Sequence, residues 1–233
     1  MALPPNLASL ALGKASAPHT LELWLDYLCP FSSKQLLGVE EHVFPLIFGQ
    51  GAKYENRLRL VIRPIPQPWH GSSTYLHEAA LASARISAAA AAAASSASTA
   101  DATDAKQNAF WTTSLALMRA QTRFFDVPAK DKTAEQIRDE LAGIVAEALS
   151  SSSVKNGGAK DVRSLIAPQG DGNAGSDVVP DLKYCVKMGR QNGVHVTPSV
   201  SLNGLLVNDV SSSFGAKEWT EWLEKNVGPA SKL

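Results

Sequence analysis

The residue with the clearest potential for chemistry is Cys29, in the segment Asp-Tyr-Leu-Cys-Pro-Phe-Ser-Ser over residues 26–33. Pro30 is typical of the first position of a helix, where its missing N–H group costs no hydrogen bond. A cysteine just before such a start lies beside free backbone amides and the positive end of the helix dipole, which favour a thiolate. We therefore expect Cys29 to be a nucleophilic sulfur, with the hydroxyl or the amide of Ser32 near it on the same face.

Asp26 is three residues before this cysteine. Its carboxylate could relay protons to and from the sulfur, or it could bond to backbone groups near the end of a strand. A carboxylate close to the thiol would also raise the thiol pKa, against the effect of the helix dipole. The sequence leaves both roles open.

The second cysteine of the chain, Cys185, has the spacing of a core residue. Together with Leu182, Val186 and Gly189 it follows the i, i+3, i+4, i+7 pattern of a buried helix face. We expect a free thiol in the core, and a disulfide with Cys29 is the alternative. Two cysteines are too few for a disulfide framework.

Three histidines raise the question of a metal site. His70 and His77 are seven residues apart, with no third ligand at a suitable spacing, so no metal site is predicted. His195 is expected on the surface. The tryptophans at positions 24, 69 and 111 are expected in the core or in a pocket wall, because no basic stripe accompanies them.

A strand–helix–strand unit positions the cysteine. The hydrophobic pattern predicts strands over 20–27 and 57–63, with a helix over 30–48 between them. The second strand alternates arginines with apolar residues, which indicates a wet face or an edge position. This order is that of a β-α-β unit.

The rest of the chain is predicted to be a block of helices followed by a hairpin and a last helix. Asn203-Gly204 between two short apolar runs is a strong hairpin signal. Strands near both ends with helices between them indicate one mixed sheet built from distant segments, hence the α/β class. The expected helices cover residues 74–95, 104–124, 133–150, 160–166, 178–192 and 216–227, with a flexible junction over 95–103.

Two motifs resemble those of one known family. The pattern Asp-x-x-Cys-Pro-Phe-x resembles the active-site segment of the DsbA-like branch of the thioredoxin superfamily, and Val-His-Val-Thr-Pro-Ser-Val-Ser-Leu-Asn-Gly over 194–204 resembles its loop with a cis-proline before a hairpin. The resemblance covers about residues 19–227. It implies a thioredoxin-like mixed β-sheet with an inserted α-helical subdomain that forms the pocket roof and sets substrate choice.

The resemblance also implies roles for individual residues. Pro198 would be cis and would face Cys29, and the backbone of Thr197 would pair with an extended peptide or with glutathione. Cys29 and Ser32 would be catalytic, and the substrate-binding set would be Pro30, Phe31, Thr197 and Pro198.

Ser32 is where this sequence departs from the family. Redox members have Cys-x-x-Cys, and Ser32 replaces the second cysteine. A mixed disulfide on Cys29 would then be resolved by an external thiol. This suits a monothiol oxidoreductase that uses glutathione as co-substrate and binds no cofactor permanently. Kappa-class glutathione transferases and related isomerases share the fold and the insertion, so a kappa-like transferase or isomerase is one alternative, and a non-catalytic binding protein is another.

The expected organisation is a discontinuous thioredoxin-like domain over 18–67 and 178–228, interrupted by a helical insertion over 68–177. A loosely ordered arm is expected over 1–17 and a targeting tail over 229–233.

The tail ends in Ser231, Lys232 and Leu233, the tripeptide read by the peroxisomal import receptor. The sequence thus predicts the peroxisomal matrix as location and that receptor as a partner.

Charge and hydropathy exclude two classes of partner. Lysine plus arginine and aspartate plus glutamate each total 22, so the net charge is zero and no nucleic-acid partner is expected. No apolar run reaches the length of a membrane-spanning helix, so no membrane span is expected. A homodimer stays open.

Overall fold

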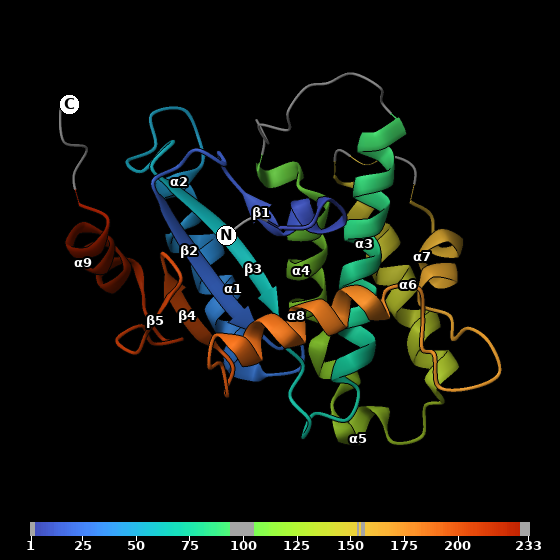
Figure 1. Cartoon of the computed structure of the whole chain (residues 1–233). Coiled ribbons are helices and arrows are strands. Elements are labelled where there is room, and N and C mark those ends of the chain that lie inside the picture. The colour runs from blue at the N-terminus through green and yellow to red at the C-terminus, as the bar shows by residue number, and fades with distance from the viewer. Residues whose placement is uncertain (1–2, 94–104, 153, 155–156, 229–233) are drawn as a thin grey trace.

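The computed structural model describes residues 3–93, 105–152, 154 and 157–228 (Figure 1). The expected flexible junction over 95–103 and the C-terminal tripeptide lie outside the described residues. No helix in these ranges is long and apolar enough to span a membrane.

A five-stranded mixed sheet forms the centre of the fold, in the order β1-β3-β2-β4-β5. β2 runs parallel to β3 and antiparallel to β4, and the remaining neighbours pair antiparallel. This arrangement confirms the α/β class and the sheet built from distant segments. The strands are β1 Ala11–Leu12, β2 His19–Leu25, β3 Leu58–Pro64, β4 Ser199–Leu202 and β5 Leu205–Val207.

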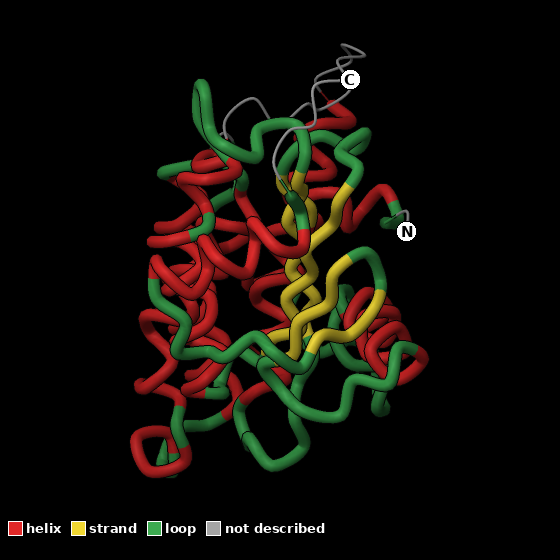
Figure 2. Tube along the Cα trace, turned by 90° about the vertical axis from the view of Figure 1, so that its left-hand side faces the viewer, coloured by secondary structure: helices red, strands yellow, loops and turns green. Residues whose placement is uncertain are grey.

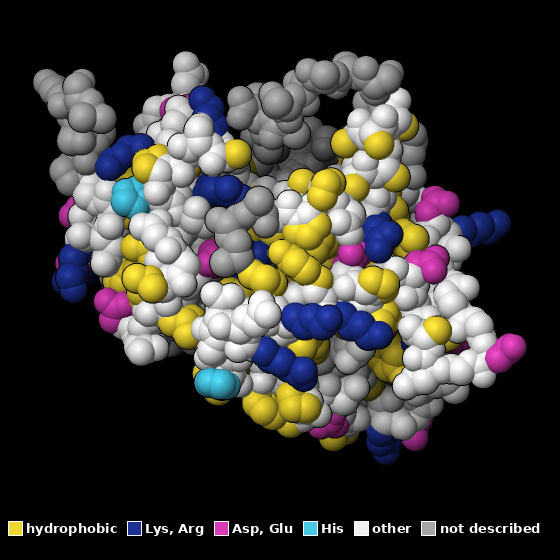
Figure 3. All heavy atoms as spheres, viewed as in Figure 1, with side chains coloured by type: hydrophobic (Ala, Val, Ile, Leu, Met, Phe, Trp, Pro, Cys, Tyr) yellow, Lys and Arg dark blue, Asp and Glu magenta, His cyan; other side chains and the backbone are white. Residues whose placement is uncertain are grey.

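Helices lie on both sides of this sheet (Figure 2). In Figure 1 the block from α3 to α7 stands beside the sheet, and α8 crosses in front of both. Basic, acidic and apolar side chains all occur on the face drawn in Figure 3. The helices are α1 Pro30–His42, α2 Phe44–Ile47, α3 Ser73–Ala93, α4 Ala109–Ala120, α5 Asp126–Ala129, α6 Ala134–Ser150, α7 Ala159–Leu165, α8 Val179–Gln191 and α9 Ala216–Asn226.

The single helix expected over 30–48 is divided into α1 and α2. Pro45 is the physical reason, because it has no N–H group to donate to the carbonyl four residues earlier. The helix expected over 104–124 is likewise shorter, because Asn108 caps its start by accepting a hydrogen bond from the amide of Trp111.

The segment expected to be a loose N-terminal arm is anchored to the sheet and the helices. β1 pairs with β3, placing Leu12 opposite Leu60. Leu7, Leu10 and Leu12 are all fully buried. The expectation was wrong over the described part of this segment, because burial of these apolar side chains away from water lowers the free energy of the folded state.

The expectation of a wet arginine face on β3 is wrong for Arg63. Its side chain is buried, and its Nε donates to Glu22 on the neighbouring strand at 2.8 Å. Glu22 also accepts from the hydroxyl of Ser201 at 2.8 Å. The arginine can therefore be buried because a carboxylate from β2 compensates its charge.

Candidate active site

Cys29 caps the N-terminus of α1, directly after the turn that follows β2. Its exposed fraction is 5%. The sulfur donates a hydrogen bond to the carbonyl oxygen of Thr197, 3.3 Å away and 168 residues later in the sequence. The predicted position at a helix start is confirmed, but the sulfur accepts no capping hydrogen bond from the amides of α1.

The loop opposite the sulfur contains a cis peptide bond between Thr197 and Pro198. This is the isomer that the sequence resemblance implies. The hydroxyl of Thr197 is buried and has no hydrogen-bond partner among the described residues. The carbonyl that faces Cys29 and the unpaired hydroxyl both belong to the residue expected to dock a substrate.

Ser32 is fully buried one turn into α1. Its hydroxyl oxygen accepts a hydrogen bond from the backbone amide of Asp26 at 3.2 Å. Ser32 thus holds the turn that carries Cys29 in place, and the expected contact between its hydroxyl and the sulfur is not among the hydrogen bonds of the described residues.

Asp26 is the centre of a buried hydrogen-bond network. Its side chain is 0% exposed. Each carboxylate oxygen accepts two hydrogen bonds, and the four donors are the amides of Leu28 at 2.9 Å and Gln67 at 3.0 Å, Nδ1 of His70 at 2.6 Å and Oγ of Ser73 at 2.5 Å. The network includes the backbone bonds considered for Asp26, and the proton-relay role stays a prediction.

These contacts determine the charge of Asp26. Burial by itself would raise the pKa of this carboxyl, but nearby His77 and the hydrogen bonds outweigh burial and lower the pKa below 3.8. The carboxylate is therefore ionised at neutral pH and can only accept hydrogen bonds.

His70 and Ser73 were not predicted as partners of Asp26, although the sequence contained a usable signal. Neighbouring parallel strands end at the same edge of a sheet. The loops that follow β2 and β3, which pair in parallel, must therefore lie side by side. His70 and Ser73 are polar residues in and just after the second of these loops.

The helical insertion makes hydrogen bonds to the active-site turn and to the start of α1. Gln121 is buried and donates to the carbonyl oxygens of Tyr27 at 3.0 Å and Cys29 at 3.4 Å. The hydroxyl of Ser33 donates to the carbonyl of Met118 at 3.2 Å. The insertion therefore fixes the position of the cysteine as well as contributing to its surroundings.

Cys185 is a core residue, as the helical spacing predicts. Burial raises the pKa of its thiol to about 12, so it is protonated and unreactive at neutral pH. Both cysteines are free thiols.

A groove of about 350 Å³ opens beside the active-site turn. Leu28 and Pro30 line it from the active-site turn, and His70 and residues 125–128 line it from the insertion. Phe31, just outside this set, is 64% exposed. Because the insertion contributes five of the seven lining residues, it is in a position to influence which molecules enter.

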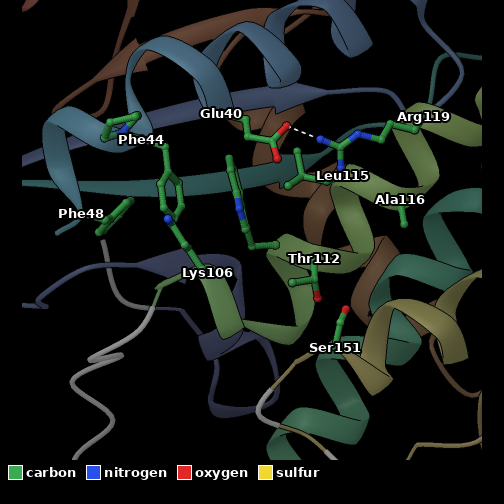
Figure 4. A pocket seen from close by; sticks show the side chains of 11 residues that line it. Glu40, Phe44, Phe48, Lys106, Thr112, Leu115, Ala116, Arg119 and Ser151 are labelled. Atoms are coloured by element: carbon green, nitrogen blue, oxygen red, sulfur yellow. Dashed lines mark hydrogen bonds and ion pairs between the residues drawn. The ribbon is translucent and has the colours of Figure 1, made fainter.

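A second cavity, of about 660 Å³, lies between α1, α2 and α4 (Figure 4). The stacked rings of Phe44 and Trp111 contribute to its lining, with the ion pair of Glu40 and Arg119 at another part. Glu40 is about 16 Å along α1 from Cys29 by helical rise. Neither cysteine lines this cavity. Leu28 and Pro30, the sequence neighbours of Cys29, line the first groove, so we assign the chemistry to that site.

The remaining residues singled out in the sequence have simpler surroundings. His195 is exposed, as expected. Trp24 and Trp111 are buried, whereas Trp69 is 61% exposed, contrary to the core or wall position expected for it. Within the described part of the chain, no three side chains of the types that bind metals are grouped as a site.

We expect the buried His77 to make the fold sensitive to mild acid. Burial lowers the pKa of His77 below 6.5 despite nearby Asp26. As the pH falls below about 6.5, the unfolded chain therefore binds a proton at this histidine that the folded protein does not bind. Folding stability should decrease with decreasing pH in this range, by at most about 1.4 kcal/mol per pH unit from this one group. Urea unfolding between pH 7.5 and 5 measures the effect, and an equal pH slope in His77→Gln would contradict it.

Sheet order, the β2–α1 turn, the cis-proline loop and the helical insertion together define a DsbA-like thioredoxin fold. No protein-family model and no curated protein matches the sequence. A proposed protein-disulfide isomerase from Pseudomonas syringae is similar in structure, with a TM-score of 0.62 and 21% identity over 94% of this chain and 99% of that one.

Two further solved structures extend the comparison. DsbA from Chlamydia trachomatis has a TM-score of 0.59 and 14% identity over 92% of this chain and 88% of its own. MdbA from Corynebacterium diphtheriae, a thiol-disulfide oxidoreductase, has a TM-score of 0.52 and 15% identity over 90% and 84%. At these identities the comparisons confirm the predicted fold.

Proposed function

We propose that this protein is a monothiol, glutathione-dependent thiol-disulfide oxidoreductase that acts through Cys29. The observation that carries the proposal is the position of the Cys29 sulfur, at the start of α1 and 3.3 Å from the Thr197 carbonyl of the cis-proline loop. A helix start favours the thiolate, which is the nucleophile in disulfide exchange.

Substrate binding would activate the sulfur. In the structure the thiol donates to the Thr197 carbonyl, and only a protonated sulfur can make that bond. A substrate backbone N–H that pairs with this carbonyl in an extended, strand-like manner would take the place of the S–H donor. The sulfur would then lose the contact that stabilises its protonated form and would be left beside the helix start.

The reaction has two exchanges. Cys29 attacks a substrate disulfide, forms a mixed disulfide and releases one substrate sulfur as a thiol. Ser32 replaces the second motif cysteine and Cys185 is buried in the core, so an external thiol must attack the mixed disulfide. That thiol forms a new disulfide with the substrate half that Cys29 held, while the Cys29 sulfur is released and its thiol restored. Glutathione is the co-substrate we propose.

Intact-protein mass spectrometry after exposure to oxidised glutathione tests this function. We expect one glutathionyl adduct, located on Cys29 and removed by reduced glutathione. Cys185→Ala should accept the same adduct, and Cys29→Ala should accept none. An unmodified wild-type protein, or an adduct on Cys185 alone, would refute the proposal.

The apolar groove beside Pro30 and His70 favours one alternative, a kappa-like glutathione transferase or isomerase, since it could hold an aromatic electrophile. Turnover of such an electrophile with glutathione, without exchange on disulfides, would support this alternative. A Cys29 that reacts with alkylating agents only near the free-thiol pKa of about 8.5 would instead favour a non-catalytic binding protein.

The C-terminal tripeptide supports a location in the peroxisomal matrix, with the import receptor as partner. A fluorescent reporter fused at the N-terminus should give a punctate distribution that coincides with peroxisomes. Deletion of Leu233 should make it diffuse. A diffuse signal from the intact fusion would refute the assignment.

A further inference from the structure

His70 joins the buried Asp26 to the groove beside Cys29. Its side chain is 22% exposed, whereas that of Asp26 is fully buried. The same imidazole lines the groove together with Leu28 and Pro30, the two residues that flank Cys29 in the sequence. A molecule that occupies the groove next to the cysteine would therefore meet the ring of His70.

The contact with Asp26 determines which nitrogen of His70 carries the proton. Asp26 is ionised, so the 2.6 Å bond between its Oδ2 and Nδ1 of His70 requires a proton on Nδ1. In the neutral ring Nε2 is then the basic nitrogen. No described residue hydrogen-bonds Nε2, so it is free to accept a proton from a molecule in the groove.

We propose that His70, oriented by Asp26, is the acid–base residue that transfers the proton of the external thiol. The inference rests on the monothiol function proposed above. In the resolving exchange, Nε2 takes the proton from the incoming thiol as its sulfur attacks the mixed disulfide on Cys29. One S–S bond forms and one breaks, the incoming sulfur is oxidised and the Cys29 sulfur is reduced.

The same residue serves both exchanges. When Cys29 first attacks a substrate disulfide, protonated Nε2 returns the proton to the departing thiolate, as reversibility of the steps requires. A monothiol enzyme needs this help more than a dithiol enzyme does. Its resolving thiol comes from solution with a pKa of about 8.5, and is therefore mostly protonated at neutral pH.

The other ionisable groups near His70 are few. His77 lies behind it in the Asp26 network and is kept neutral because burial lowers its pKa. Asp126, from the insertion, lines the same groove. The edge of the Trp69 ring contacts His70 with the ring centroids 6.1 Å apart. Unlike His77 and Asp126, His70 both lines the groove and makes a hydrogen bond to Asp26.

The test uses protein carrying a preformed glutathione mixed disulfide on Cys29. Release is followed by intact mass with two thiols: glutathione, which is mostly protonated at pH 6.5, and an aromatic thiol that is already ionised. His70→Asn keeps an N–H donor for Asp26 but has no basic nitrogen. We expect His70→Asn to slow release by glutathione about 100-fold, the lower end of general acid–base effects, and release by the aromatic thiol less than about 3-fold.

His195→Asn is the matched control, because it makes the same substitution at an exposed position next to the cis-proline loop. It should change neither rate. An equal loss with both thiols in His70→Asn, or no loss with either, overturns the inference. Failure of the mixed disulfide to form on Cys29 would overturn the proposed function itself, so the two failures are distinguishable.

A measurement on the wild-type protein covers the case in which His70→Asn does not fold. If His70 removes the proton, the logarithm of the glutathione release rate should rise with a slope well below one between pH 6 and 8. A slope of one, the behaviour of pre-formed thiolate alone, overturns the inference.

Discussion

Replacement of Cys29 by serine is expected to reduce disulfide exchange at least about 1,000-fold, equivalent to about 4 kcal/mol in the activation barrier. The hydroxyl of serine is similar in shape to the thiol but smaller, and it does not ionise at neutral pH. It also cannot form the mixed disulfide that the mechanism requires. The measurement is the rate of exchange with oxidised glutathione, together with intact mass of the product.

Cys185→Ala is the control for this experiment, because it removes the other thiol of the chain. It should lose folding stability through the cavity left in the core, but it should keep its exchange rate. Full exchange activity in Cys29→Ser would show that the chemistry does not use this sulfur.

Asp26→Asn is expected to lower the free energy of unfolding by about 2–6 kcal/mol at pH 7. Four donors face the two carboxylate oxygens, and an amide offers one oxygen and one NH₂ group in their place. Two buried donors would then face the NH₂ group without an acceptor, at about 1–3 kcal/mol each. Urea unfolding monitored by circular dichroism measures the loss.

The pH dependence distinguishes this explanation from a general packing defect. The folded pKa of Asp26 is lowered, so its stabilising contribution is present above the unfolded value of 3.8 and is lost as the pH falls through the folded value. The difference between wild type and Asp26→Asn should therefore shrink below about pH 4. Asp126→Asn, the same change in the groove, should cost less than about 1 kcal/mol. A difference that is constant with pH would contradict the assignment.

The local parts of the site could be predicted from the sequence. A proline that starts a helix a short turn after a strand places Cys29 at a helix start whatever surrounds it, and Cys29 is indeed the N-cap of α1. Asn203 and Gly204 both adopt positive φ, of 54° and 84°, as the Asn-Gly hairpin signal requires. Thr133 and Gln136 form a capping box at the start of α6, another local feature that depends on a three-residue spacing.

The sequence was less informative where polar side chains are buried. Arg63 was expected on a wet strand face, because periodicity indicates which positions share a face but not what covers that face. Its partner Glu22 is 41 residues away in sequence and adjacent only because β2 and β3 pair in parallel. The apolar N-terminal segment was misjudged for the same reason, since nothing in its own pattern indicates that β3 is available to pair.

By itself, the sequence therefore determined the order of the main strands and helices, the α/β class, and the placement of Cys29 at a helix start, since these depend on hydrophobic period and on the backbone limits of proline and glycine. Only the tertiary structure decided that the Thr197 carbonyl faces the sulfur, that Gln121 donates a hydrogen bond to the active-site turn, and that Asp26 binds His70. These pairs join segments 44 to 168 residues apart. A hydrogen bond depends on positions to within a fraction of an ångström, and those positions exist only once the distant elements have packed.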